Sequence, residues 1–272
     1  MAAPASDTVF AGSIPQVYDR LLVPLIFAAS ADDLAQRAAV LRPDRVLEVA
    51  AGTGVLTRAL AQLLLPQARL VATDLNPAML ARAAAVGTAR PVQWLVADAQ
   101  RLPFDDASFD LVVCQFGVMF FPDKALAHAE ALRVLRPGGS LLFNVWDRIE
   151  HNDFAAVVTD ALAQRYPADP PRFMARVPHG YFNRQAIELD LAAGGWVQPA
   201  RIEAWRGTSR ADRALDAATA YCQGTPLRHE IEAREPGGLL AATQDCADAI
   251  AQRHGAGPVA GRIQSLVVSV RR

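Results

Sequence analysis

Cysteine is scarce in this sequence: Cys114, Cys222 and Cys246 are the three among 272 residues. They are too few and too scattered for the disulfide framework of a small secreted domain. The sequence contains no Cys-x-x-Cys or Cys-x-x-His pair, so we expect no metal site. A reduced, cytoplasmic protein is the expectation that follows.

An excess of charge of one sign is also missing. Lys and Arg number 27 and Asp and Glu number 28, which gives a formal net charge of −1. A chain so close to neutral has no overall attraction to nucleic acid or to an anionic membrane surface. We therefore expect no nucleic-acid partner.

Long hydrophobic runs are absent from the sequence as well. The most apolar early stretch, residues 21–29, is interrupted by Pro24 and is far shorter than the roughly 20 residues that a spanning helix needs. Residues 1–7 carry no basic segment and no apolar segment, so no secretory signal is expected. The sequence predicts no membrane span.

Apolar residues are nonetheless plentiful, at 52% of the chain against 20% charged residues. This composition is too apolar for a disordered protein, and the length is sufficient for a core that folds without disulfides. One large domain, or one domain that carries a cap, fits a chain of 272 residues.

Strand and helix patterns alternate over the first half of the chain. Short apolar runs predict buried strands at residues 45–50, 69–73, 92–96, 109–115 and 141–146. Asn76 followed by Pro77 is a favourable helix start, and Asp123 can cap a helix that runs to about Leu135. The alternation predicts a doubly wound α/β sheet with right-handed crossovers.

Helices are also expected outside this alternation. Residues 14–41 have helical character, and Asp32 or Asp33 can cap a helix there. The elements expected further on are a helix over 154–166, a loop over 167–180 and a helix over 183–193.

The last part of the chain predicts an insertion. Residues 201–205 and 263–270 look like two closing strands, and more than 50 residues with helical patterns around 211–222 and 238–253 separate them. This separation implies an inserted helical cap. We therefore predict an N-terminal helical segment over 1–43, a core over 44–206 and 259–272, and an acceptor-binding cap over 207–258.

The segment Val46–Gly54 carries the sharpest signal for function. Glu48 lies inside a predicted strand, and the glycine-rich turn Gly52-Thr53-Gly54 follows it and opens a helix. Such a turn forms a cradle for a small molecule at the carboxyl end of a parallel strand, since glycine permits close approach and the helix start offers free amides. Asp74 ends the next strand, 20 residues beyond Gly54, where a carboxylate can accept from both hydroxyls of a ribose.

Two cofactors suit a turn of this kind. A dinucleotide needs Gly-x-Gly-x-x-Gly, but Thr57 stands where the third glycine belongs. The Glu48 carboxylate disfavours a pyrophosphate and favours an ammonium group. S-adenosylmethionine has an amino group, a ribose and no phosphate, so it fits better than a nicotinamide cofactor.

Residues 46–146 resemble the class I S-adenosylmethionine-dependent methyltransferases, in particular the group with the ubiquinone/menaquinone-biosynthesis C-methyltransferases. The matching motifs are Val46–Gly54, Thr73–Leu80, Val96–Ala99 with Leu102–Phe104, Ser108–Val112 and Val134–Gly139, in the order and spacing of the family. The resemblance implies a Rossmann-like sheet of the methyltransferase type, with seven strands, and S-adenosylmethionine as the cofactor.

The resemblance also implies roles for individual residues around the methionine and ribose. The turn from Gly52 through Thr53 to Gly54 would lie under the methionine moiety, and Asp74 would bind the ribose with Leu75 and Met79 packed nearby. Glu48 is Asp in many relatives, and it keeps the charge with a longer reach.

Further roles follow for the adenine and the rest of the cofactor. Asp98 would accept from the adenine amino group, and the Ala99 amide would face a ring nitrogen. Gln115 would face the cofactor, and Tyr18 resembles tyrosines that cover it. Ala50 replaces a glycine found in many relatives, and its methyl group narrows the cradle slightly.

Histidines are the candidates for a general base that acts on the methyl acceptor. Neutral imidazole can accept a proton at pH 7, which makes His179, His229 and His151 candidates, although each also reads as an ordinary surface or loop histidine. His128 and His254 sit in helical patterns and are expected to be solvated. The aromatic residues that suit a small apolar acceptor are Phe173, Tyr181, Phe182, Trp196, Trp205 and Tyr221.

The leading hypothesis is methyl transfer from S-adenosylmethionine to a small, apolar or aromatic molecule at O or C. The alternatives are a nicotinamide-dependent oxidoreductase and a non-catalytic S-adenosylmethionine-binding protein. The expected partner is a small-molecule methyl acceptor, and the sequence leaves the oligomeric state open.

Overall fold

The computed structural model describes residues 12–255 and 257–272, and the chain divides into two compact units. The first, here called the helical unit, comprises the part up to Ala29, Trp146–Gly180 and Arg206–Gln264. The second, the sheet unit, comprises Ser30–Val145, Tyr181–Trp205 and Ser265–Arg272.

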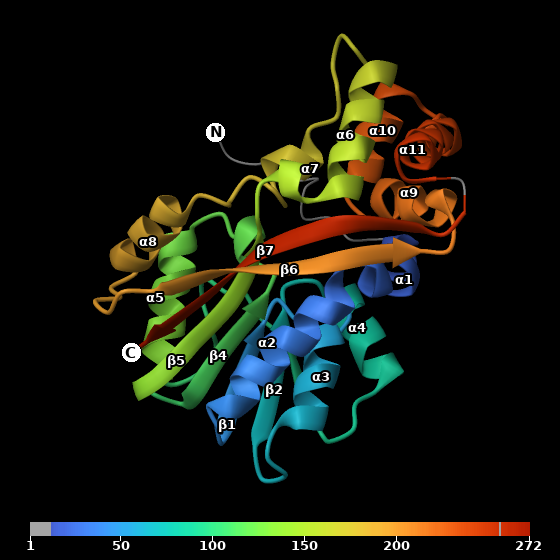
Figure 1. Cartoon of the computed structure of the whole chain (residues 1–272). Helices are drawn as coiled ribbons and strands as arrows, with labels where there is room; N and C mark the ends of the chain where they lie inside the picture. Colours follow the sequence, from blue (N-terminus) through green and yellow to red (C-terminus); the bar gives the residue numbers. More distant parts are fainter. Residues whose placement is uncertain (1–11, 256) are drawn as a thin grey trace. The chain divides into compact units, whose positions relative to one another are not determined.

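Seven strands form one sheet in the order β3-β2-β1-β4-β5-β7-β6 (Figure 1). Their bounds are β1 Arg45–Val49, β2 Arg69–Asp74, β3 Gln93–Val96, β4 Phe109–Gln115, β5 Leu135–Trp146, β6 Arg201–Ala211 and β7 Val259–Arg271. Strands β1 to β5 pair in parallel. The predicted seven-stranded Rossmann-like sheet is confirmed.

Strand β7 runs antiparallel to β5. The Gly138 amide donates to the Arg272 carbonyl at 3.0 Å, and the Asp147 amide donates to the Gln264 carbonyl at 3.1 Å, so the partner number falls as the chain number rises. The strands from β3 to β5 therefore form a parallel sheet, and the antiparallel strand β7 extends this sheet beyond β5.

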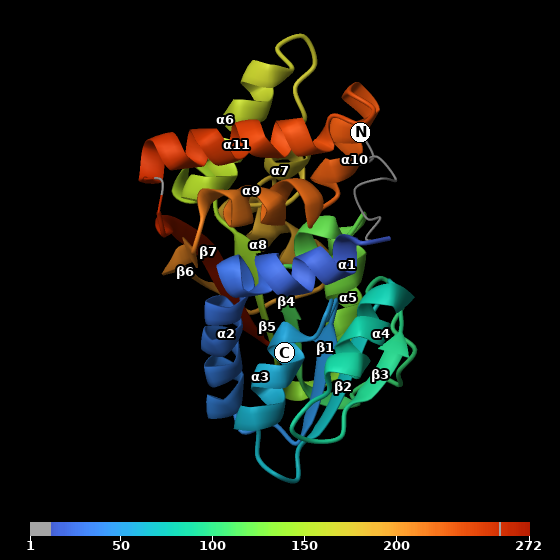
Figure 2. The same ribbon diagram turned by 90° about the vertical axis from the view of Figure 1, so that its right-hand side faces the viewer.

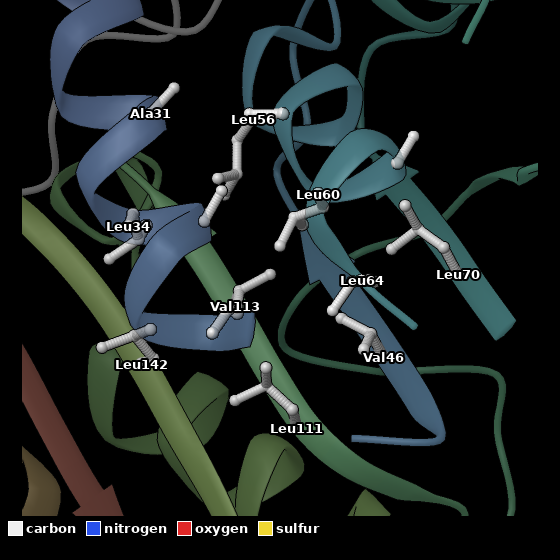
Figure 3. Close-up of a cluster of buried hydrophobic side chains, with 14 of the residues drawn as sticks. Ala31, Leu34, Val46, Leu56, Leu60, Leu64, Leu70, Leu111, Val113 and Leu142 are labelled. Carbon is white, nitrogen blue, oxygen red and sulfur yellow. The ribbon is translucent and has the colours of Figure 1, made fainter. Parts of the chain in front are cut away.

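The helices of the sheet unit pack on the strands through apolar faces. They are α2 Ala28–Val40, α3 Val55–Leu63, α4 Pro77–Val86, the short η3 Val118–Phe120, α5 Lys124–Val134 and α8 Arg184–Ala193. Figure 3 shows Leu34 of α2 and Leu60 of α3 meeting Val46 and Val113 of the strands in one fully buried cluster. Helix α5 packs against α8 elsewhere in the unit.

Side-chain N-caps start several of these helices. The Asn76 side chain accepts from the Ala78 amide at the start of α4, and the Asp123 side chain accepts from the Leu126 amide at the start of α5. Both predicted caps are confirmed. Asn183 caps α8 in the same way.

The helical unit contains α1 Ile14–Val17, the π-helix η2 Tyr18–Phe27, η4 Ile149–His151, α6 Asp153–Arg165, α7 Phe173–Arg176, α9 Ala214–Gln223, α10 Leu227–Arg234 and α11 Leu239–His254. Figure 2 shows α11 lying across α6 and along α9, and these helices contact one another. Along the chain, α9, α10 and α11 lie between β6 and β7, where helices were expected.

Several predicted boundaries are wrong. Asp32 and Asp33 lie inside α2 rather than at a cap, because η2 already supplies the preceding helical turns, and Asp33 instead pairs with Arg37 at 2.7 Å. Strand β5 begins at Leu135 rather than 141, and β6 continues to Ala211. The length of a continuous apolar run underestimates the length of such strands, because the ends of these strands carry exposed polar residues.

Two short α-helices were not expected. The segment predicted as a loop over 167–180 contains α7, and α10 follows α9 after a short break. Helix α10 buries only Leu227 and Ile231 of its eight residues, so its sequence has little helical periodicity to detect.

His128 is not solvated as predicted but is 2% exposed. It lies within α5, with its ring 5.4 Å from that of Phe143, and the Trp196 indole donates to its carbonyl at 3.0 Å. The packing of α5 against α8 therefore covers this histidine. Among the described residues no helix is long and apolar enough to cross a membrane, and no cluster of potential metal ligands occurs.

Candidate functional site

The turn after β1 is built from left-handed backbone conformations. Gly52 has φ +57° and Gly54 has φ +82°, and Ala50 also has a positive φ of 56°. A left-handed alanine costs roughly 1–2 kcal/mol, so this turn stores strain. Gly117 fits against this turn only because it has no side chain, since a Cβ at Gly117 would lie 2.5 Å from the Ala50 Cβ.

The Asp74 carboxylate at the end of β2 holds this turn. Its Oδ2 accepts from the Gly52 amide at 2.8 Å, and its Oδ1 accepts from the Asn76 amide at 2.8 Å. Burial raises the pKa of Asp74, and the two amide hydrogen bonds oppose that shift. The sequence did not predict that the Asp74 carboxylate would hold the Gly52 turn in place.

Glu48 is a buried acid in the middle of β1. The residue is 1% exposed, and its Oε2 has no hydrogen-bond partner in the part of the chain that the structure describes. Burial raises the pKa of Glu48 to about 8, and hydrogen bonding by Thr57 and the nearby Arg58 charge oppose that shift. A buried carboxyl oxygen without a partner is costly, and a cationic ligand group would offset that cost.

Threonine hydroxyls surround the same turn. Thr53 and Thr57 are buried, and the Thr53 Oγ1 atom likewise lacks a hydrogen-bond partner among residues 12–255 and 257–272. Buried polar atoms in native proteins are usually satisfied. Their concentration around Gly52–Gly54 fits a polar ligand in this cradle.

Apolar side chains stand beside Asp74. Leu75 is 64% exposed directly after the carboxylate, so it is available to pack against a ligand. Met79 is buried, and its Cε would lie 3.7 Å from a Cβ placed on Gly52. Polar and apolar groups thus converge at the end of β2.

The end of β3 brings Asp98 and Ala99 to this edge of the sheet. The Ala97 amide donates to the Asp74 carbonyl at 3.1 Å, which ties the two strand ends together. Asp98 Oδ1 accepts from the Gln100 amide at 2.9 Å. Ala99 is 8% exposed.

Strand β4 ends at Gln115, whose side-chain amide donates to the Ser30 hydroxyl at 3.2 Å. The next residue, Phe116, has φ +51°, and its amide donates to the buried Asn144 side chain at 3.0 Å. Strained non-glycine residues concentrate at functional sites. Phe116 and Asn144 are therefore additions to the site that no sequence signal had identified.

The remaining candidates lie in the helical unit. Tyr18 stacks on Phe27 at 5.1 Å between ring centroids. His151 and His179 meet at one residue, Asp147: His151 Nδ1 is 3.2 Å from its carboxylate, and His179 Nδ1 is 2.8 Å from its carbonyl oxygen. His229 lies in α10.

Comparison with known proteins identifies the family. A family model described as the methyltransferase domain matches residues 47–143. A demethylmenaquinone methyltransferase of Mycolicibacterium gilvum is 33% identical over 185 residues, which cover 65% of this chain and 76% of the relative. The chain belongs to the class I S-adenosylmethionine-dependent methyltransferases.

Two further comparisons agree with this assignment of a methyltransferase. A ubiquinone/menaquinone biosynthesis C-methyltransferase of Saccharophagus degradans is 42% identical over 167 residues, which cover 57% of this chain and 67% of the relative. The structure of a SAM-dependent methyltransferase from Aquifex aeolicus superimposes with a TM-score of 0.51 at 18% identity, covering 70% of this chain and 89% of that one. The latter likeness concerns the fold alone.

The family model matches only part of this chain. Residues 47–143 run from β1 into β5 and contain Glu48, the glycine turn and Asp74. The residues of the helical unit lie outside the matched range. The cofactor of the family is S-adenosylmethionine, and the unpartnered Oε2 atom of the buried Glu48 carboxyl fits the ammonium group of that cofactor.

Proposed function

We propose that the sheet unit binds S-adenosylmethionine through the cradle around Gly52–Gly54. Glu48 receives the ammonium of the methionine part, with Thr53 beside it, and Asp74 receives the ribose hydroxyls. The observation that carries the proposal is the buried Glu48 Oε2 without a partner in the described chain, directly before a strained glycine turn. Ion pairing with an ammonium would satisfy this atom.

The adenine end of the cofactor is assigned to the strand ends that follow. Asp98 accepts from the amino group, the Ala99 amide faces a ring nitrogen, and Leu75 with Met79 packs beside the ribose. Ala50 and Gln115 border the methionine part. The exposed Leu75 side chain supports this assignment, because an apolar group 64% exposed beside a carboxylate suits a ring ligand.

Methyl transfer depends on holding the acceptor in line with the transferred group. When bound, S-adenosylmethionine supplies an electrophilic methyl group on a sulfonium sulfur. Good positioning of two reactants is worth roughly 7–11 kcal/mol. The protein's main contribution is therefore the shape of the acceptor site.

The acceptor is a small, apolar or aromatic molecule that is methylated at O or C. The names of the two relatives, which act in demethylmenaquinone methylation and in ubiquinone/menaquinone biosynthesis, support this class. So do the buried aromatic side chains of the helical unit, among them Trp146, Phe173 and Tyr221.

The 207–258 cap is assigned to acceptor binding and the 44–206 and 259–272 core to the cofactor, with 1–43 as an N-terminal helical segment. Within the helical unit, the break after α9 lies against η2: a Cβ on Gly224 would be 3.4 Å from the Tyr18 nitrogen. Thr225 uses its hydroxyl locally, donating to the Tyr221 carbonyl at 2.8 Å. Tyr221 is thus the better candidate for acceptor contact.

Calorimetry with S-adenosylhomocysteine tests the cofactor assignment. Asp98→Ala should weaken binding by about tenfold, because one hydrogen bond to a charged group is lost. Asp98→Asn should weaken it less, since the amide oxygen still accepts. For a cofactor analogue whose purine lacks the amino group, Asp98→Ala and the unaltered protein should bind equally.

The class of reaction is tested with the same protein. Methyl-labelled S-adenosylmethionine and dihydroxynaphthalene should give a labelled naphthalene product. Binding of NADH in place of S-adenosylhomocysteine would contradict the proposal and favour the oxidoreductase. Cofactor binding without transfer to any of a panel of hydroxylated rings would favour a non-catalytic binding protein.

A further inference from the structure

A cavity of about 430 Å³ lies within the helical unit. Its lining comes from three parts of that unit: η2, the segment that joins the end of β6 to α9, and the start of β7. Figure 1 shows the end of β6 and the start of β7 beside α9. The volume is within the range of small-molecule sites, roughly 300–1,000 Å³, and no residue of the cofactor cradle lines this cavity.

The walls of the cavity are tied together by contacts inside the helical unit. Helix η2 contacts α9, and Figure 2 shows the N-terminal helix running below α9. The buried Ser209 hydroxyl of β6 donates to the Leu25 carbonyl of η2 at 2.8 Å. Leu25 lines the cavity, and so does Arg210, the next residue after Ser209. The cavity is therefore set by the packing of η2 against β6.

One part of the lining is apolar. This part, here called the apolar lining, consists of Leu21, Pro24 and Leu25 of η2 and Val259 of β7. Leu25 and Val259 are buried, whereas Leu21 is half-buried and Pro24 is exposed. An apolar ring or chain placed here would remove the exposed part of this surface from water, which favours binding.

The charged part of the lining contains two arginines without a partner. Arg20 and Arg210 line the cavity together with Asp212 and Asp216. Asp216 is already engaged, because Arg213 donates to it through Nε at 2.9 Å and Nη2 at 2.6 Å. These hydrogen bonds lower the pKa of Asp216, and the charge of Arg20 adds to that shift. Within residues 12–255 and 257–272, neither Arg20 nor Arg210 has a hydrogen-bond or ion-pair partner.

The charge balance of the cavity selects the charge of a ligand. With Arg213 included, three arginines stand against two aspartates, which leaves a net charge of +1. One negative charge on a ligand balances this excess. Arg20 and Arg210 each offer N–H donors, and guanidinium groups form charge-assisted hydrogen bonds with carboxylates. A dianion would leave surplus negative charge beside Asp212, and a cation would meet two unpaired arginines.

We propose that this cavity binds an apolar monocarboxylate, with Arg20 and Arg210 at the carboxylate and the apolar lining against the body of the ligand. The inference goes beyond the proposed methyl transfer and does not depend on it, since the cavity and the cofactor cradle share no residue. It assigns the helical unit a second class of small-molecule ligand.

Calorimetry with naphthoate tests the proposal, and naphthamide is the uncharged counterpart of this probe. Naphthoate should bind the unaltered protein about tenfold more tightly than naphthamide, because the amide lacks the charge that the arginines pair with. Arg20→Gln and Arg210→Gln should each weaken naphthoate binding by about five- to tenfold, since a charge-assisted hydrogen bond at a partly solvated site is lost. Neither substitution should change naphthamide binding. No binding of naphthoate up to about 5 mM would overturn the proposal.

Arg206→Gln is the matched control for the charge. Arg206 is another exposed arginine of β6, four residues before Arg210, but it donates to the Gln264 side chain at 3.0 Å and does not line the cavity. The control removes the same charge as Arg210→Gln and should leave naphthoate binding unchanged. Equal weakening in the two variants would show a general attraction to a positive surface and would overturn the site.

Two further substitutions test the cavity itself. Asp212→Asn should tighten naphthoate binding by about threefold, because it removes a competing negative charge, and should leave naphthamide binding unchanged. Ala260→Trp should abolish the binding of both probes, since the exposed Ala260 lines the cavity and an indole there would fill it. Urea unfolding with an unchanged midpoint verifies that Ala260→Trp keeps its fold. Unaltered naphthoate binding in this folded variant would place the ligand elsewhere and contradict the proposal.

Discussion

The two units of the molecule begin their helices differently. In the sheet unit α4, α5 and α8 start at side-chain caps on Asn76, Asp123 and Asn183, whereas α3 starts at Gly54 without one. In the helical unit α6, α9, α10 and α11 have no side-chain cap hydrogen bond. Three helices of the sheet unit thus have starts that the local sequence specifies, and the four helices of the helical unit depend more on packing between distant segments.

The largest expected effect concerns the cradle. Gly54→Ala should lower S-adenosylhomocysteine affinity by at least about 100-fold and destabilise the fold by roughly 2–4 kcal/mol. Gly54 has φ +82°, and an added Cβ would lie 3.0 Å from the Ala83 Cβ and 3.2 Å from the Trp94 ring. Calorimetry and urea unfolding measure the two quantities.

Gly87→Ala is the matched control for this prediction. Gly87 also has φ +82°, but an added Cβ would meet nothing within 4 Å. This variant should show only the backbone cost of about 1 kcal/mol and an unchanged affinity. Equal losses in the two variants would mean that close packing at Gly54 has no part in cofactor binding.

The contrast between starts specified by the local sequence and elements held by distant packing also explains what the sequence could predict. Strand β4 was expected over 109–115 and is found there, and the Asn76 and Asp123 caps lie where expected. These features depend on residues that adjoin along the chain. Helix α10 was missed because its stability comes from packing rather than from periodicity.

The site follows the same rule. The glycine turn and Asp74 could be found because a strand end, a turn and a carboxylate follow one another in a known order. The hydrogen bond from the Gly52 amide to Asp74 could not be found, since it joins the turn after β1 to the end of β2. The meeting of His151 and His179 at Asp147 depends on the fold of the segment between them.

The second prediction concerns pH and Glu48. Its pKa is about 8 in the folded, ligand-free protein against an ordinary 4.5, because the carboxyl is buried. Below 4.5 both states hold the proton, and between these values the unfolded chain releases it while the folded protein does not. Stability of the ligand-free protein should therefore fall as pH rises, by up to about 1.4 kcal/mol per unit.

Urea unfolding of the unaltered protein and of Glu48→Gln between pH 5 and pH 8 checks this sign. The substitution should remove most of the slope. In addition, binding of an ammonium group should release a proton from Glu48 at pH 7, so the binding heat of S-adenosylhomocysteine should vary with the ionisation enthalpy of the buffer. A slope that is the same in both proteins would mean that Glu48 is ionised before the cofactor binds.

The smallest effects concern the helix caps, which define the contrast between the units. Asn183→Ala should lower the free energy of unfolding by about 1 kcal/mol, because the Ala186 amide loses its acceptor.

Arg213→Ser should instead stabilise the protein and raise the urea midpoint slightly. Arg213 occupies the N-cap of α9 with φ −140° and ψ 148°, an extended conformation in which a serine hydroxyl can accept from the first turn, and it places a cation at the positive end of the helix. The existing pair between Arg213 and Asp216 at 2.6 Å is exposed and contributes little, so its loss should not cancel the gain. If Arg213→Ser instead destabilises the protein as much as Asn183→Ala does, then α9 already has an effective start and the proposed difference between the two units is wrong.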